Sequence, residues 1–127
     1  MIKYTVKVLE NGTKEWFLNG ELHREDGPAI ERSNGDKWWY LNGELHREDG
    51  PAVEDPNGYK AWYLNGKEHR EDGPAVEYSD GDKWWFLNGE HLTEEEHKKA
   101  TRKHKEYTVS ELEGILGEKI KIVKEGN

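Results

Sequence analysis

The chain has 127 residues, enough for one domain with at most a small appendage. Its formal net charge is −8, and all of this charge belongs to residues 1–92, which hold 11 Lys and Arg against 19 Asp and Glu. An acidic protein disfavours non-specific binding to nucleic acid and anionic lipid, because both need a positive protein face. We therefore expect neither nucleic acid nor membrane among its partners.

Large aromatic side chains compensate for a low apolar content. Hydrophobic residues make up 32% of the chain and include six Trp, six Tyr and two Phe. A few large rings can stabilise a thin sheet without a wide aliphatic core. The absence of cysteine excludes disulfides and thiolate metal sites, and no apolar run approaches the roughly 20 residues of a membrane span. We predict a cytoplasmic protein, because the start MIKYTVKVLE alternates too strictly for a signal peptide.

The N-terminal segment predicts a hairpin that caps a repeat array. Four apolar residues alternate with polar ones, which is the period of a strand with one buried face: Ile2, Tyr4, Val6 and Val8. Asn11-Gly12 then favours a type I′ turn, and residues 13–18 return as the partner strand.

A repeat of 23 residues organises the chain. Four copies open on a tryptophan at equal spacing: Trp16, Trp39, Trp62 and Trp85. In each copy an aromatic strand runs into Asn-Gly, a hairpin signal, and in the first three the turn-forming segment His-Arg-Glu-Asp-Gly-Pro leads to a second strand. Each unit has two strands, or three if the intervening Glu-Leu segment pairs separately. We predict a mainly β protein with an elongated, twisted antiparallel sheet of hairpin repeats over residues 1–92.

Alternation along the first strand of each unit assigns two faces. The opening Trp and the Leu two residues later, such as Trp39 and Leu41, point one way and are predicted to form the buried stack. The opposite face, called here the aromatic face, also carries rings and is predicted to be partly exposed. This face and the positions where the copies differ supply the candidate binding residues: Phe17, Asp36, Trp38, Tyr40, Tyr59, Tyr63, Asp82, Trp84 and Phe86.

The remainder of the chain, residues 93–127, predicts a small α+β tail. Thr93–Glu96 is a capping box that opens a polar helix to about Lys105, and Thr108–Glu111 opens a second, short helix. Lys119–Lys124 alternates apolar residues with lysine and predicts a final strand. Because the tail is too small for its own core, we expect it to dock on the array or to pair with a second copy. Exposed sheet edges offer another route to a homo-oligomer.

The unit Trp-Tyr-Leu-Asn-Gly-x-x-His-Arg-Glu-Asp-Gly-Pro-Ala resembles MORN-type repeats over about residues 10–92. It is most similar to divergent MORN-like arrays in small phage and bacterial proteins, some of them labelled antitoxins. The resemblance implies a scaffold and interaction role without catalytic residues. Arg-Glu-Asp-Gly-Pro replaces the glycine-rich spacing of the usual MORN unit, so MORN lipid binding is not implied. A phage-encoded inhibitor of a host defence protein, acting in the host cytoplasm, fits this resemblance.

The repeated polar residues do not predict a catalytic or metal site. Three histidines recur at the repeat spacing, but equivalent residues two strands apart are about 10 Å from each other, too far to share one zinc ion: His23, His46 and His69. We expect each imidazole to pack on a tryptophan and bond a turn carbonyl. The Glu-Asp pairs are expected to stabilise turns and pair with Arg24, Arg47 and Arg70, because identical copies cannot offer one acid and one base in different environments. We predict no metal, no cofactor and no enzyme.

The sequence therefore predicts a non-enzymatic module that binds a protein partner. Two alternatives stay open. One is a protein that sequesters a nucleotide or another small ligand between stacked aromatic rings, and the other is an antitoxin-like component. A hydrolase with a site where the array meets the tail is the least favoured hypothesis.

Overall fold

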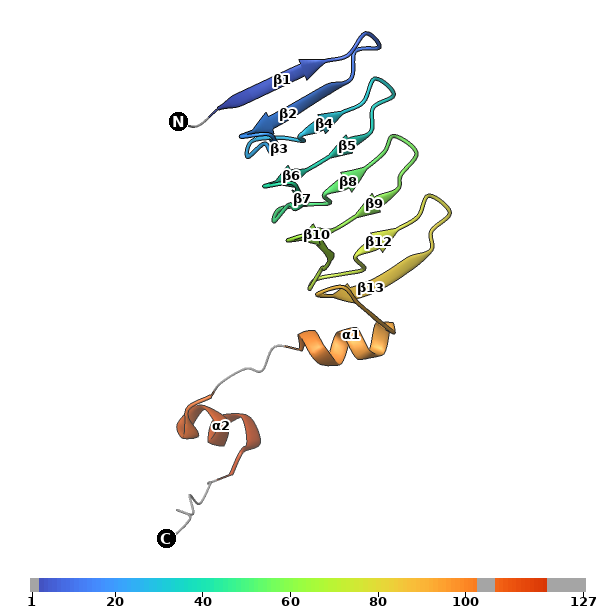
Figure 1. The fold of residues 1–127 in the computed structure, drawn as a ribbon. Helices are drawn as coiled ribbons and strands as arrows, with labels where there is room; N and C mark the ends of the chain where they lie inside the picture. Colours follow the sequence, from blue (N-terminus) through green and yellow to red (C-terminus); the bar gives the residue numbers. More distant parts are fainter. Residues whose placement is uncertain (1–2, 103–106, 119–127) are drawn as a thin grey trace.

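The computed structural model describes residues 3–102 and 107–118 and shows an elongated array of short strands followed by two helices (Figure 1). Within this part of the chain, nine strands follow one another in the order β1-β2-β4-β5-β8-β9-β12-β13-β14, and β3 pairs with β2 beside that path. Neighbouring strands run antiparallel. The mainly β architecture of hairpin repeats is thus confirmed.

The first repeat contributes three strands, and each of the next two contributes four because the first strand of the unit is interrupted at its tryptophan. Strands of five residues lie at the two ends of the array: β1 (Tyr4–Val8), β2 (Lys14–Leu18) and β13 (Lys83–Leu87). Strands of two residues build the middle of the main sheet: β4 (Ile30–Glu31), β5 (Lys37–Trp38), β8 (Val53–Glu54), β9 (Lys60–Ala61) and β12 (Val76–Glu77). Further short strands form the hairpins at its side: β3 (Glu21–Leu22), β6 (Tyr40–Leu41), β7 (Glu44–Leu45), β10 (Tyr63–Leu64), β11 (Lys67–Glu68) and β14 (Glu90–Leu92). The Glu-Leu segment therefore pairs as a strand of its own.

The opening tryptophan of a unit lies where the chain passes from the main sheet into the hairpin. Trp39 separates β5 from β6, its N–H donates to the carbonyl of Ala52 (2.7 Å), and its carbonyl accepts the N–H of His46 (3.0 Å). Trp16 and Trp62 make the same two bonds in their own units. The backbone of this residue therefore joins the two rows of strands.

The four Asn-Gly turns that follow the first strands of the units have the predicted chemistry, whereas the turn at Asn11-Gly12 does not. Asn42 (φ 50°) and Gly43 (φ 78°) both adopt the left-handed conformation that a type I′ turn requires. At Asn11-Gly12 only the glycine has a positive φ, and the N–H of Leu9 donates to the carbonyl of Thr13. The predicted type I′ turn is wrong there: three residues form the loop, and glycine supplies its single left-handed position.

The largest buried side chains belong to the aromatic face, so the predicted burial of the Trp-Leu face is wrong. Seven apolar residues are buried: Ala29, Ile30, Ala52, Ala61, Ala75, Val76 and Phe86. Val76 shows which face is buried. It lies directly opposite Ala61 on β9 and Trp84 on β13, and both of these residues belong to the aromatic face. Trp39 and Leu41 are only half-buried.

An arginine covers the tryptophan of each of the first three units. The guanidinium of Arg47 lies 3.8 Å from the Trp39 ring, donates to Asp49 (3.0 Å) and donates to the carbonyl of Pro51 (3.1 Å). A methyl group on Gly50 would lie only 2.9 Å from the guanidinium carbon, so the loop backbone closes over the stack. Equivalent stacks join Arg24 to Trp16 and Arg70 to Trp62, at 4.0 and 3.8 Å. The predicted pairing of these arginines with the acidic pairs is confirmed.

A row of alternating charges fixes the register of the main sheet. Seven residues on consecutive strands lie directly opposite one another: Lys14, Glu31, Lys37, Glu54, Lys60, Glu77 and Lys83. Each opposite-charge pair contributes roughly 0.2–1 kcal/mol, whereas like charges directly opposite are destabilising. A shift of one residue towards the start of the partner strands would place the lysines opposite Ile30, Val53 and Val76, so these pairs favour the observed register over that one.

The repeated histidines link neighbouring units. Nδ1 of His23 accepts the N–H of Asn42 (2.9 Å), and His46 and His69 accept from the matching asparagines of the next units. The prediction that each imidazole bonds a turn carbonyl is therefore wrong, because the ring accepts a turn amide instead. Nδ1 must carry no proton in this bond.

The two ends of the array differ. The apolar side chains of β1 are exposed, which contradicts the predicted buried face: Tyr4 61%, Val6 48% and Val8 65%. At the other end, α1 (Glu94–Thr101) docks on the array, and its buried His97 places Nε2 2.6 Å from the carbonyl of Arg70. The prediction that the tail docks on the array is confirmed for α1.

Both helices begin at the predicted capping boxes. Thr93 caps α1, which ends earlier than the predicted Lys105. Thr108 caps α2 (Val109–Leu116), which lies beyond α1 (Figure 1). The predicted last strand, Lys119–Lys124, lies outside the described residues. Neither helix is long and apolar enough to cross a bilayer.

Replacement of Arg47 by lysine should lower the free energy of unfolding by about 1–3 kcal/mol, because an ammonium cannot reproduce the planar stack and the forked donors. Chemical denaturation followed by tryptophan fluorescence measures the loss. Arg32→Lys is the matched control: this exposed arginine stacks on Trp38 at 4.9 Å, and its replacement should cost less than about 0.5 kcal/mol. Equal losses in the two variants would contradict the structural role of the Arg47 stack.

Candidate functional site

Five rings form a continuous cluster at the C-terminal end of the aromatic face. The ring centroids lie 5.4 Å apart for Tyr59 and Tyr78, 5.8 Å for Tyr78 and Trp84, and 5.3 Å for Trp84 and His91. His91 also stacks on Phe86 at 5.0 Å. These five residues are called the aromatic cluster below.

The aromatic cluster presents a graded surface. Trp84 is 43% exposed and Tyr78 is 39% exposed, whereas Phe86 is buried beside them. Val76 lies directly opposite Trp84 on β12, Ala61 lies opposite Val76 on β9, and these two buried residues form the apolar floor of the region. Two large rings are therefore held at the surface by packed neighbours, with little rotamer freedom left to lose on binding.

The cluster forms where the repeats depart from their consensus. Tyr59 occupies the position of Asp36 and Asp82, and Ala61 occupies the position of Trp38 and Trp84. Tyr59 packs against the core group that contains Ala61. A small residue in β9 thus allows a tyrosine ring to lie where the neighbouring units place an indole.

Sequence reasoning missed two members of the cluster. Tyr78 stands where other copies have Arg32 and Asp55, and His91 stands where the first two copies have leucine. Both departures are visible in the alignment of the repeats. Neither residue lies in the first strand of a unit or in the residues leading into it, so the alternation of that strand gives no signal for them.

The nine predicted binding residues do not form one site. Tyr59, Trp84 and Phe86 belong to the cluster, and Tyr63 packs against the core beneath it. Asp82 is adjacent, because its carbonyl accepts the N–H of Tyr78 (2.9 Å). The other four lie in earlier units, where cations stack on two of them: Phe17, Asp36, Trp38 and Tyr40.

Burial keeps the phenols on this face protonated. Desolvation and the nearby Glu68 carboxylate raise the pKa of Tyr63 to about 12, and its hydroxyl donates to Glu68 (3.4 Å). Desolvation also raises the pKa values of Tyr40 and Tyr59. At neutral pH this face therefore offers uncharged hydroxyl groups.

The structure predicts a loss of stability in alkali. In the unfolded chain Tyr63 ionises near its ordinary pKa of 10.0, whereas in the folded chain it stays neutral to about 12. The contribution of this group is complete below pH 10 and is lost as the pH rises towards 12. Tyr63→Phe should remove about 1 kcal/mol of this fall, since the partly hydrated site screens the effect. Urea denaturation at pH 9 and pH 11 measures it, and equal falls in both proteins would contradict it.

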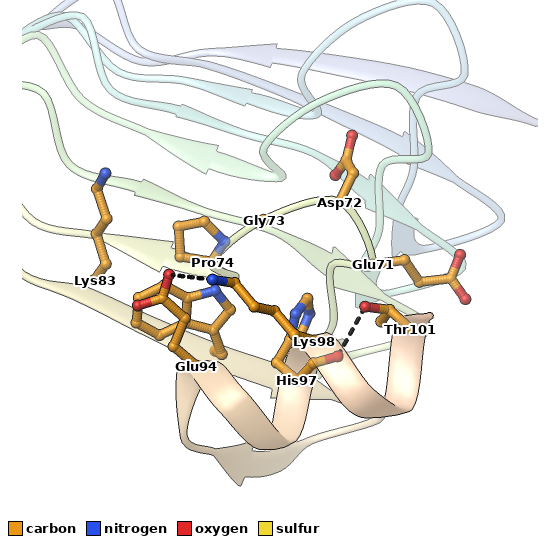
Figure 2. Close-up of a pocket in the computed structure, with 10 residues that line it drawn as sticks. Glu71, Asp72, Gly73, Pro74, Lys83, Glu94, His97, Lys98 and Thr101 are labelled. Atoms are coloured by element: carbon orange, nitrogen blue, oxygen red, sulfur yellow. Dashed lines mark hydrogen bonds and ion pairs between the residues drawn. The ribbon is translucent and has the colours of Figure 1, made fainter. Parts of the chain in front are cut away.

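A hollow of about 460 Å³ lies where α1 meets the array (Figure 2). Its polar groups are engaged structurally: Lys98 pairs with Glu94 (3.6 Å), and the Thr101 hydroxyl donates to the carbonyl of His97 (2.7 Å). His97 itself bonds the backbone of Arg70. This arrangement caps the array and pairs no nucleophile with a base.

Within residues 3–102 and 107–118, no three His, Asp or Glu side chains are grouped to hold a metal ion. The repeated histidines bond backbone amides, and Asp26, Asp49 and Asp72 bond arginines. Comparisons with protein-family models, curated proteins and solved structures find no match for this chain.

Proposed function

We propose that this protein is a non-enzymatic module that binds another protein through the aromatic cluster. The observation that carries the proposal is the exposure of Trp84 and Tyr78 on a buried apolar floor. Tryptophan and tyrosine in such packed positions dominate the energetics of protein interfaces. The resemblance to MORN-like arrays of small phage and bacterial proteins suggests an inhibitor of a host protein or an antitoxin-like component, and either would act by binding a protein.

The charge around the cluster favours a partner with a basic rim. Asp80 and Asp82 are exposed in the loop that precedes Trp84, and residues 1–92 carry the whole net charge of −8. Opposite charges at the rim of an interface speed association and exclude wrong partners. The same acidity opposes nucleic acid, whose phosphates need lysine and arginine.

Sequestration of a nucleotide is less well supported. A base held between two rings needs two free ring faces, whereas Trp84 and His91 stack on each other at 5.3 Å with an interplanar angle of 25°. Tyr78 packs on the same indole in a T-shaped arrangement. The cluster therefore offers a rim for contact and no slot for a planar ligand.

Trp84→Ala should abolish capture of the partner. The immobilised protein is exposed to a bacterial lysate, and retained proteins are identified by mass spectrometry. Loss of a buried interface tryptophan typically costs about 2 kcal/mol or more, roughly a 30-fold loss of affinity. Tyr78→Ala should weaken capture of the same protein.

Tyr107→Ala is the matched control, because Tyr107 is equally exposed (43%) but lies in the tail. It should retain the partner. A protein captured equally by wild type and Trp84→Ala would contradict the proposed site. No specific capture together with a nucleotide-induced rise in melting temperature would favour the small-ligand alternative.

A further inference from the structure

The first strand of the array has an open edge. The carbonyl of Lys3 accepts the N–H of Asn19 (2.8 Å), and the N–H of Leu9 donates to the carbonyl of Thr13 (2.8 Å), so the odd-numbered residues of this segment face β2. Antiparallel strands direct alternate residues to the same neighbour. The N–H and C=O groups of the even-numbered residues therefore point outward, and no described residue lies beyond β1 (Figure 1). These residues are Tyr4, Val6 and Val8.

The same three residues carry the exposed apolar side chains of β1, at 61%, 48% and 65% exposure. An edge strand that combines unpaired backbone groups with an apolar face is a template for another strand. At the opposite end of the array α1 closes the sheet, with β14 paired along β13. The array is therefore capped at its C-terminal end, whereas no described residue covers the outer edge of β1.

The outward groups of β1 match those of a second β1. With the two-fold axis at Val6, antiparallel pairing places Val6 opposite its own copy and Tyr4 opposite Val8. All three outward N–H groups and all three outward C=O groups of each strand then find partners in the other. On this face only apolar side chains meet.

The lysines of β1 select this register. In the symmetric pairing Lys7 lies opposite Thr5, and Lys3 lies opposite Leu9. Shifting one strand by two residues in one direction places Lys3 opposite Lys7, and shifting it the other way places Lys7 opposite Lys7. Like charges directly opposite are destabilising, so one register avoids both clashes.

We propose that two copies of this chain pair through β1 about a two-fold axis at Val6, which joins their sheets into one. Charge supports a second copy as the occupant. Residues 3–9 hold two lysines and no acid, whereas the rest of the array is acidic, so this pairing joins the least acidic ends and keeps the acidic arrays apart. The contact lies at the opposite end from the aromatic cluster, so each dimer presents two clusters.

A charge exchange at the two-fold axis tests the register. Val6→Lys and Val6→Glu each place like charges directly opposite, so each variant alone should sediment as a monomer of 14.8 kDa. An equimolar mixture should form a heterodimer of twice that mass, because lysine then faces glutamate. Sedimentation equilibrium over a concentration series measures all three samples, and restored association in the mixture proves that the variants are folded.

Ile115→Lys is the matched control, since Ile115 is 62% exposed on α2. It should dimerise as wild type does. A monomeric wild type, a dimeric Val6→Lys variant, a mixture without heterodimer, or loss of the dimer in Ile115→Lys would each overturn the proposal. None of these substitutions changes a residue of the aromatic cluster. The dimerisation experiment and the lysate-capture experiment can therefore fail independently of each other.

Discussion

An arginine stacked on a tryptophan holds each inner unit of this array together. The sheet is too thin to enclose the repeated indoles, and the guanidinium covers the ring that a second layer of sheet would otherwise cover. Arg47 can do so because Asp49 and the carbonyl of Pro51 fix its donors while the backbone at Gly50 approaches within contact distance. In the Arg-Glu-Asp-Gly-Pro segment, the arginine, aspartate, glycine and proline therefore all contribute to the stack.

Hydrogen bonds and opposite-charge pairs between units couple each Arg–Trp stack to the neighbouring units. The imidazole of each repeat accepts the amide of an asparagine in the next, and the Lys-Glu ladder places every charge between two opposite charges in the inner strands. Each unit therefore depends on its neighbours for both backbone and side-chain partners, as expected for a one-dimensional array. At the two ends of the array no further unit supplies these partners. At the C-terminal end His97 of α1 bonds Arg70, and at the N-terminal end no described element covers β1.

The sequence predicts the elements of this fold better than their burial. Periodicity, Asn-Gly turns and capping boxes are local signals, and the strands, turns and helix starts that follow from them are found. Burial depends on neighbours two strands away in space. Trp39 is large and apolar, yet a charged side chain covers it, whereas Ala61 is small and fully buried. For the candidate site, Trp84 and Tyr59 follow from the repeat pattern, while His91 requires the knowledge that β14 returns beside Trp84 and Phe86.

The regular repeat limits the places where this protein could bind a partner selectively. Equivalent residues in successive units share one environment, so a partner that read only the consensus could bind at several registers with similar affinity. Selectivity requires a position that occurs once. The region of the aromatic cluster is such a position, because Tyr59, Ala61, Tyr78 and His91 all depart from the consensus between residues 59 and 91. Their rings meet there because antiparallel strands bring departures from different copies onto one face. Repetition supplies the rigid support, and the departures supply the specific surface.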